Sequence, residues 1–216
     1  MLTADLFYSF RSPYSYLGSA RYRQLTREWD LEIRLRPVYP IAIRNPSFFE
    51  QVNPLWVPYL LKDVVRTAEF GGVPFQWPKP DPVVMDRETR EISPEQPYIR
   101  RLTYLGLEAA RRGKGLAFAC EVGHALWGEG VENWHLPENF GPIVARAGLD
   151  LAELEAAISG REDALEAEIA ANQDEQEQAG HWGTPCLIFD GEPFFGQDRI
   201  DMAIWRMKQH GLQAHG

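Results

Sequence analysis

The strand-to-helix transition at residues 6–18 constrains the fold more than any other part of the sequence. Apolar and aromatic residues at 6–10 are typical of a buried strand, and Ser12-Pro13 follows before a helical pattern of apolar residues. Serine is a favoured N-cap and proline suits the first helical position, so we expect a helix capped by Ser12. The N-terminus of such a helix stabilises an anion or a thiolate. A lone Ser-Pro pair, however, marks a simple helix cap more often than an active site.

Composition excludes several classes of protein. The chain has 216 residues and a net charge of −9, which argues against a nucleic-acid or anionic-membrane partner. No apolar run is long enough to cross a membrane, and the first residues lack the basic start of a signal peptide, so we expect a cytoplasmic protein. Cys120 and Cys186 lie far apart, and the histidines show no ligand spacing. We therefore predict neither a disulfide framework nor a metal site.

The order of elements can be predicted along the whole chain. A strand at 32–38 follows the first helix, and a right-handed crossover would make the two strands parallel. Frequent prolines between 40 and 98 preclude a continuous sheet there. Two short strands, 186–189 and 193–195, flank Asp190-Gly191, which is a hairpin signal, and a last helix covers 197–210. Helices are expected between these regions, at 59–70, 98–112, 115–129, 137–147, 151–159 and 161–179.

This order predicts an α/β protein with a thioredoxin-like fold, β-α-β followed by β-β-α, and a large all-helical insertion between the halves. We place the thioredoxin-like domain at residues 1–40 and 180–216 and the helical insertion domain at 41–179. In that architecture the proline before the third strand usually follows a cis peptide bond, and Pro185 occupies that position.

Two blocks of sequence resemble a known family. Residues 7–18, FYSFRSPYSYLG, are similar to the N-terminal motif of the 2-hydroxychromene-2-carboxylate isomerases and kappa-class glutathione transferases, in the DsbA-like branch of the thioredoxin superfamily. Gly180, Gly183 and Pro185, followed by FFGQDR at 194–199, resemble the C-terminal motif of the same family. The blocks occur in the family's order, so the resemblance spans most of the chain.

The resemblance implies a glutathione site. Ser12 stands where redox relatives carry the first cysteine of CxxC, and the tetrad SPYS has no thiol for disulfide exchange. The Ser12 hydroxyl would instead hold the glutathione thiolate. Thr184, before the cis Pro185, would offer its backbone to the cysteinyl amide. Asp198 and Arg199 would hold the γ-glutamyl amine and carboxylate; the alternative is that they are ordinary charges at a helix start.

Three positions depart from the family pattern or match it loosely. Trp56 stands where relatives often carry a lysine that meets a glutathione carboxylate. Either glutathione is held with fewer charges, or the thiol partner differs. Asn45 corresponds to a family asparagine that contacts glutathione. Cys186 places a thiol beside the expected site; the alternative is a small core residue on a buried strand.

The function implied is that of a glutathione-dependent isomerase acting on an aromatic conjugated keto acid of the 2-hydroxychromene-2-carboxylate type. The reaction is reversible thiolate addition, bond rotation and elimination. The alternatives are a kappa-like glutathione transferase or peroxidase, and a non-catalytic thioredoxin-like binding protein.

Relatives are dimers, so we expect a homodimer. The proline-rich segment 72–97 is too apolar for a free loop, and we predict that it packs on a neighbouring element or on a second subunit.

Overall fold

A mixed four-stranded sheet organises the protein. The computed structural model describes residues 1–86, 89 and 91–215. The strands lie in the order β2-β1-β3-β4. β1 and β2 are parallel, and the other two pairings are antiparallel. The strand bounds are β1 Leu2–Tyr8, β2 Leu31–Pro37, β3 Cys186–Phe189 and β4 Glu192–Phe195.

The connections explain this topology. Helix α1, Pro13–Glu28, carries the chain from β1 to the parallel β2, as such a crossover requires. Asp190 and Gly191 join β3 to β4 with φ values of 51° and 76°. Two consecutive positive φ values define the tight turn whose twist suits a hairpin, and aspartate and glycine tolerate them best. The predicted thioredoxin-like α/β fold is confirmed.

Helices make up most of the remaining chain, and every expected helix is present. Three of them differ clearly from expectation. α4 begins at Trp56 instead of residue 59, and the expected helix 115–129 changes to π-type hydrogen bonding at His124. The last helix, expected from residue 197, begins as a 3₁₀ turn and becomes α-helical at Ile200. The bounds are α2 Ile41–Arg44, α3 Phe48–Gln51, α4 Trp56–Gly71, α5 Pro97–Arg111, α6 Gly115–Gly123, a π-helix His124–Glu129, α7 Pro137–Arg146, α8 Leu151–Ile158, α9 Glu162–Gln178, a 3₁₀ turn Gln197–Arg199 and α10 Ile200–Gln209.

The first strand was predicted at 6–10 but spans Leu2–Tyr8. Residues 2–5 carry no clear strand signal of their own. They become a strand because Leu2 through Asp5 pair with residues 31–34 of β2. Ser9 and Phe10 leave the sheet and form the loop that leads to Ser12. Pairing partners, which lie elsewhere in the chain, therefore set the ends of this strand.

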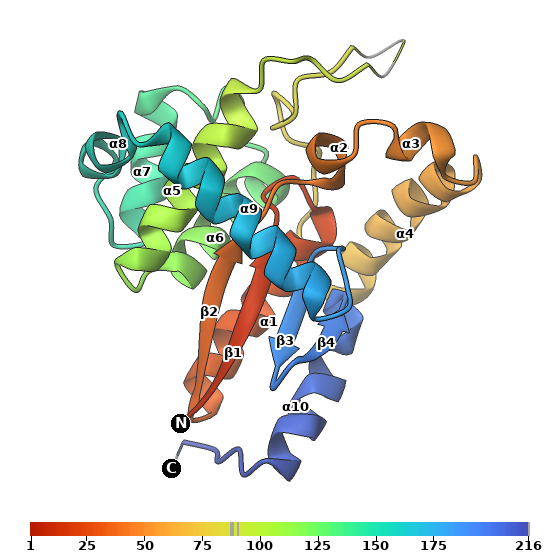
Figure 1. The fold of residues 1–216 in the computed structure, drawn as a ribbon, viewed down its shortest axis with the longest axis vertical. Helices are drawn as coiled ribbons and strands as arrows, with labels where there is room; N and C mark the ends of the chain where they lie inside the picture. Colours follow the sequence, from red (N-terminus) through yellow and green to blue (C-terminus); the bar gives the residue numbers. More distant parts are fainter. Residues whose placement is uncertain (87–88, 90, 216) are drawn as a thin grey trace.

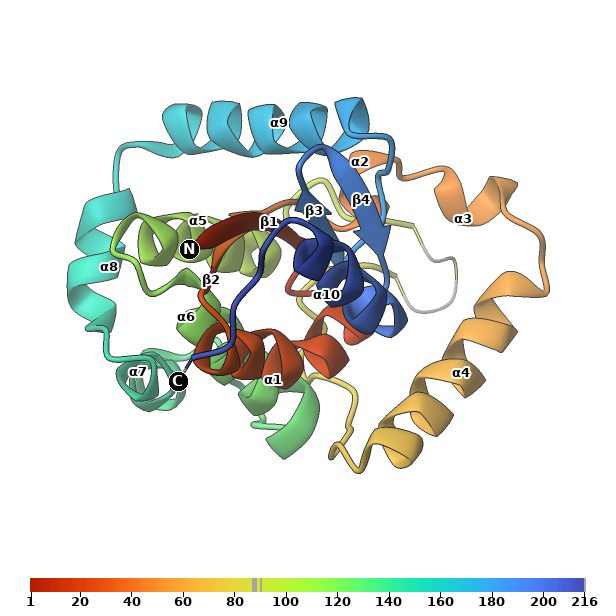
Figure 2. The same cartoon turned by 90° about the horizontal axis from the view of Figure 1, so that it is seen from below.

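Helices cover both faces of the sheet. α9 lies on one face, and α1 and α10 lie on the other (Figure 2). α5 to α8 gather beside β2, whereas α2 to α4 lie toward the β4 side (Figure 1). One buried apolar cluster runs from strand residues such as Leu6 into insertion residues such as Phe118 and Phe140. The division at residues 40 and 180 stays a prediction. None of the helices in the described part of the chain is long and apolar enough to cross a membrane.

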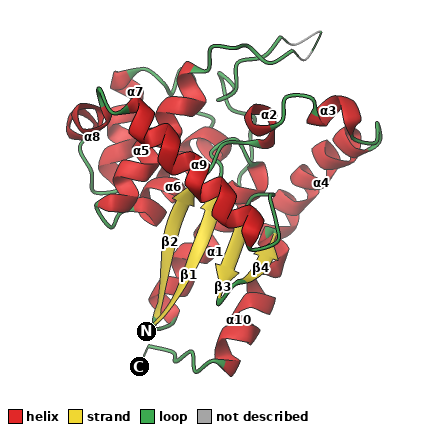
Figure 3. Cartoon of the chain, in the orientation of Figure 1, coloured by secondary structure: helices red, strands yellow, loops and turns green. Residues whose placement is uncertain are grey.

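The described residues between α4 and α5 form a long loop (Figure 3) that packs on its own chain. Tyr16 donates a hydrogen bond to the Pro74 carbonyl at 2.6 Å, and Phe75 stacks on Trp127 with ring centroids 5.9 Å apart. A cis peptide bond precedes Pro80, which the sequence did not predict. The prediction that 72–97 packs on a neighbouring element is confirmed, except for residues 87, 88 and 90, which lie outside the described part.

Candidate functional site

Ser12 joins the start of α1 to the loop before β3. It has an extended backbone, with φ −90° and ψ 116°, and its Oγ accepts a hydrogen bond from the Ser15 amide at 3.2 Å. The predicted N-cap is thus confirmed. The same hydroxyl donates to the carbonyl oxygen of Thr184 at 3.0 Å. This bond connects residues 172 positions apart and places Ser12 beside the peptide bond that precedes Pro185.

The conformation of the loop 183–185 is fixed by a hydrogen bond from α9 and by close packing against Phe195. The peptide bond before Pro185 is cis, as predicted. Gln176 on α9 donates to the Gly183 carbonyl at 2.6 Å. A Cβ at position 183 would lie 2.4 Å from the Phe195 ring, so a larger residue would require that ring to move. The Thr184 amide N–H has no hydrogen-bond acceptor among the described residues, and it remains available to a bound molecule.

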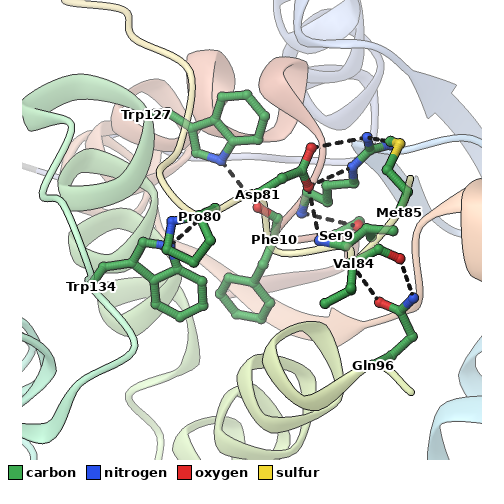
Figure 4. A network of polar contacts seen from close by, with 11 residues as sticks. Ser9, Phe10, Pro80, Asp81, Val84, Met85, Gln96, Trp127 and Trp134 are labelled. Atoms are coloured by element: carbon green, nitrogen blue, oxygen red, sulfur yellow. Dashed lines mark hydrogen bonds and ion pairs between the residues drawn. The ribbon is translucent and has the colours of Figure 1, made fainter. Parts of the chain in front are cut away.

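The loop that precedes Ser12 is fixed by the π-helix and by the proline-rich segment (Figure 4). Trp127 donates its indole N–H to the Phe10 carbonyl at 3.1 Å, and Trp134 donates to the Pro80 carbonyl at 2.9 Å. Arg11 makes two hydrogen bonds to Asp81, at 3.0 and 3.1 Å. Phe10 and Arg11, which precede Ser12, are therefore fixed by Trp127 of the π-helix and by Asp81 of the proline-rich segment.

A cleft of about 730 Å³ opens between α4 on one side and Thr184 and residues 195–198 on the other. Its volume lies within the range of small-molecule sites, roughly 300–1,000 Å³. Ser12 is not one of the lining residues, but its hydroxyl is bonded to Thr184, which is. The cleft is lined by Tyr14, Tyr59, Asp63, Arg66, Thr67, Phe70, Thr184, Phe195, Gly196, Gln197 and Asp198.

The structure brings together most of the predicted site residues, but not all. Thr184 and Asp198 line the cleft. Arg199 forms an ion pair with Asp198 at 2.7 Å, and both side chains are largely exposed. Asn45 is not among the lining residues: it ends α2, and its side-chain oxygen accepts a hydrogen bond from Ser47 at 2.8 Å. The geometry therefore lends no support to a role for Asn45.

The wall of the cleft formed by α4 was missed from the sequence. Tyr14 donates a hydrogen bond to Asp63 at 2.5 Å, and Arg66 donates to the other oxygen of Asp63 at 2.8 Å. The Tyr14 hydrogen bond, more than any other effect, lowers the pKa of Asp63 below 3.8. Burial, reinforced by Asp63, raises the pKa of Tyr14, so that its phenol stays protonated at neutral pH. The available signal was the polar face of the helix, opposite its apolar stripe.

Trp56 packs in a chain of rings that leads to the cleft. Its ring lies 5.6 Å from that of Phe48, and the Phe48 ring lies 5.4 Å from that of Trp182. His181 stacks between Trp182 and Phe195, at 5.7 and 4.0 Å. Burial lowers the pKa of His181. The position where relatives carry a lysine is thus occupied by an uncharged ring in an aromatic cluster.

Cys186 is a core residue. It is fully buried on β3, and burial raises the pKa of its thiol to about 12. Cys120 is also free and buried, and burial raises its pKa to about 12 as well. A thiolate is the reactive form of cysteine, so neither thiol is reactive at neutral pH. The described residues contain no group of histidine, cysteine or acidic side chains that could hold a metal ion.

Residues 3–204 match the family of the DSBA-like thioredoxin domain. The chain belongs to this family. It is 26% identical over 211 residues to 2-hydroxychromene-2-carboxylate isomerase from Pseudomonas putida, covering 93% of this chain and 92% of that one. The Sphingobium xenophagum enzyme of the same name is also 26% identical, over 205 residues, with 92% of this chain and 94% of the relative covered. The resemblance drawn from the two sequence blocks is confirmed, and these relatives are isomerases, the predicted enzyme class.

Solved structures give the same fold. A 2-hydroxychromene-2-carboxylate isomerase superposes with a TM-score of 0.71 and 21% identity, covering 97% of this chain and 96% of that one. The cytosolic disulfide reductase DsbM from Pseudomonas aeruginosa, solved with GSH, has a TM-score of 0.58 and 18% identity, covering 97% of this chain and 100% of that one.

Proposed function

We propose that the protein is a glutathione-dependent isomerase acting on an aromatic conjugated keto acid of the 2-hydroxychromene-2-carboxylate type. The observation that carries the proposal is the junction of Ser12 with Thr184: a hydroxyl at a helix N-terminus meets the loop of a cis proline beside a cleft. The names of the curated relatives support the reaction type.

The residues at the cleft fit glutathione. The unpartnered N–H of Thr184 is suited to an amide carbonyl of a peptide, and the Asp198–Arg199 pair offers an acid and a base to a zwitterion. The cleft is large enough for a tripeptide. DsbM, which shares the fold, was solved with GSH. Trp56 packs among rings, and no lysine lines the cleft in the described part of the chain. We therefore propose fewer charged contacts to the cofactor.

Bound glutathione would supply a thiolate that adds reversibly to a conjugated double bond, so that rotation and elimination yield the other isomer. Ser12 would turn its O–H from the Thr184 carbonyl toward the sulfur and stabilise its negative charge. The positive end of the α1 dipole would add to this stabilisation; Pro13 has no N–H, and the N–H groups of Ser15 and Tyr16 already bond to Ser12. Loss of one such preorganised donor typically costs about 2.7–4 kcal/mol in the transition state.

The redox alternatives lack a nucleophile at the site. The tetrad SPYS contains no thiol, and the nearby Cys186 is buried with its pKa raised to about 12. Thiol–disulfide exchange requires an accessible thiolate. These observations favour a serine-stabilised cofactor thiolate over a protein thiol.

The test is calorimetric titration of glutathione into wild type and Ser12→Ala, with the thiol pKa of the bound cofactor followed by its ultraviolet absorbance. We expect Ser12→Ala to raise that pKa and to slow isomerisation. Asp150→Ala is the matched control, because it removes the cap of α8, which lies outside the cleft. Equal glutathione affinity together with an unchanged thiol pKa in Ser12→Ala would remove the role given to Ser12. Released conjugates in place of isomer would indicate a transferase.

A further inference from the structure

One face of α4 carries an aromatic, charged stripe. Tyr59, Asp63, Arg66 and Phe70 recur at intervals of three or four residues, which places them on the same side of a helix. All four line the cleft, opposite Thr184 and the loop that follows β4. The glutathione contacts proposed above use only the opposite wall, so this stripe has no role yet.

Arg66 is the single basic side chain among the residues that line the cleft. Its Nε donates to Asp63 at 2.8 Å, and its Nη2 donates to the Tyr59 hydroxyl at 2.6 Å and also to Asp63. The guanidinium lies 5.0 Å from the centre of the Tyr59 ring. Nη1 has no acceptor among the described residues, and 57% of the side chain is exposed. The Nε and Nη2 side of the guanidinium is thus held by Asp63 and Tyr59, and the two N–H groups of Nη1 remain as donors.

The orientation of Arg66 depends on α1 as well as α4. Asp63 accepts from Arg66 with Oδ1 and from the Tyr14 hydroxyl with Oδ2, at 2.5 Å. Tyr14 lies two positions after Ser12, so the guanidinium is tied to the helix that carries the thiolate site. An ordinary exposed ion pair between neighbouring turns of a helix would have no such link to a second element.

The surroundings of Arg66 are aromatic. Tyr59 is 58% exposed and Phe70 is 96% exposed, and both line the cleft. Phe195, on the opposite wall, is 44% exposed. A guanidinium matches the geometry of a carboxylate, and exposed rings gain by covering an apolar surface. The stripe therefore combines recognition of an anion with recognition of a ring.

We propose that Arg66 binds the carboxylate of a ring-bearing acid in this cleft and that Tyr59 and Phe70 contact its ring. Asp63 and Tyr14 are positioning residues that orient the guanidinium. The assignment rests on the proposed function for its substrate, but it concerns a different part of the cleft from the glutathione contacts, so the two can fail separately.

The experiment measures binding of trans-cinnamate and of uncharged trans-cinnamamide, without glutathione, to wild type, Arg66→Gln and Arg66→Lys. Arg206→Gln is the matched control. Arg206 forms an ion pair with Glu192 at 2.6 Å and lies 4.9 Å from the centre of the Trp205 ring, so its surroundings resemble those of Arg66. It does not line the cleft. We expect Arg66→Gln to weaken cinnamate binding about tenfold and to leave cinnamamide binding unchanged. Arg66→Lys should recover part of the loss, and the control should match wild type.

Several outcomes would overturn the proposal. One is that wild type does not bind cinnamate, and another is that wild type and Arg66→Gln bind cinnamate with equal affinity. A third is that Arg66→Gln weakens binding of cinnamate and of cinnamamide equally, because this would mean a purely steric role for Arg66. A loss of glutathione affinity in Arg66→Gln with cinnamate unaffected would assign the guanidinium to a carboxylate of glutathione instead. If Ser12→Ala leaves glutathione affinity and thiol pKa unchanged while Arg66→Gln weakens cinnamate binding as expected, only the role of Ser12 toward the cofactor is refuted.

Discussion

The ion pair between Arg11 and Asp81 should stabilise the protein measurably, because it joins the loop before Ser12 to the proline-rich segment. Arg11 is 19% exposed, and both of its hydrogen bonds to Asp81 have good lengths, 3.0 and 3.1 Å. Asp81 also accepts from the Val83 amide at 2.8 Å. The substitution Asp81→Ala removes all three bonds and leaves a partly buried guanidinium without its carboxylate.

The magnitude follows from the exposure of the two groups. A hydrogen bond to a charged group contributes about 1.5–3 kcal/mol when solvent is excluded. Asp81 is 45% exposed, so screening by water reduces this contribution. We expect Asp81→Ala to lower the free energy of unfolding by about 1–2 kcal/mol, which corresponds to a fall in Tm of roughly 2–8 °C for a chain of this size.

The assay is urea unfolding followed by tryptophan fluorescence, with the slope m checked for constancy. Glu132→Ala is the control from the same region, since its ion pair with Lys79 is exposed on both sides, at 70% and 69%. That change should cost less than about 0.5 kcal/mol. If Asp81→Ala costs no more than Glu132→Ala, the reasoning from burial is wrong. A double-mutant cycle with Arg11→Met separates the pair energy from other effects.

Four further predictions concern Gly183, the two cysteines, Asp63 and the oligomeric state. Gly183→Ala places a Cβ against Phe195 and should destabilise the protein by about 1–3 kcal/mol by thermal unfolding; an unchanged Tm would contradict the tight fit. With the pKa of Cys186 raised to about 12 by burial, Ellman's reagent should label neither cysteine in the native protein at pH 8, and both in urea. The pKa of Asp63 is lowered in the folded state, so its stabilising contribution is complete above pH 3.8 and is lost as the pH falls through the folded-state value. Tyr14→Phe should therefore raise that pKa, measured by carboxyl NMR, and an unshifted titration would refute the link. Light scattering should give twice the chain mass of 24.7 kDa, whereas a monomer would refute the predicted homodimer.

The sequence alone determined the features whose signals lie within a few residues of one another. Ser12-Pro13 predicted a capped helix start, Asp190-Gly191 predicted a hairpin, and both are present. These predictions succeed because a cap or a tight turn depends on local backbone angles and on hydrogen bonds between near neighbours. The order of elements along the whole chain added the cis bond before Pro185, which no local signal distinguishes from an ordinary proline at a strand start.

Only the tertiary structure decided which side chains share the cleft. The polar face of α4 marks Arg66 and Asp63 only as surface residues, and they become part of a site because α4 docks so that Asp63 meets Tyr14 on α1. The bond from Ser12 to Thr184 likewise spans 172 positions. Contacts of this kind depend on how separate helices and strands pack, through apolar surfaces distributed over the whole chain, and no short stretch of sequence encodes that packing.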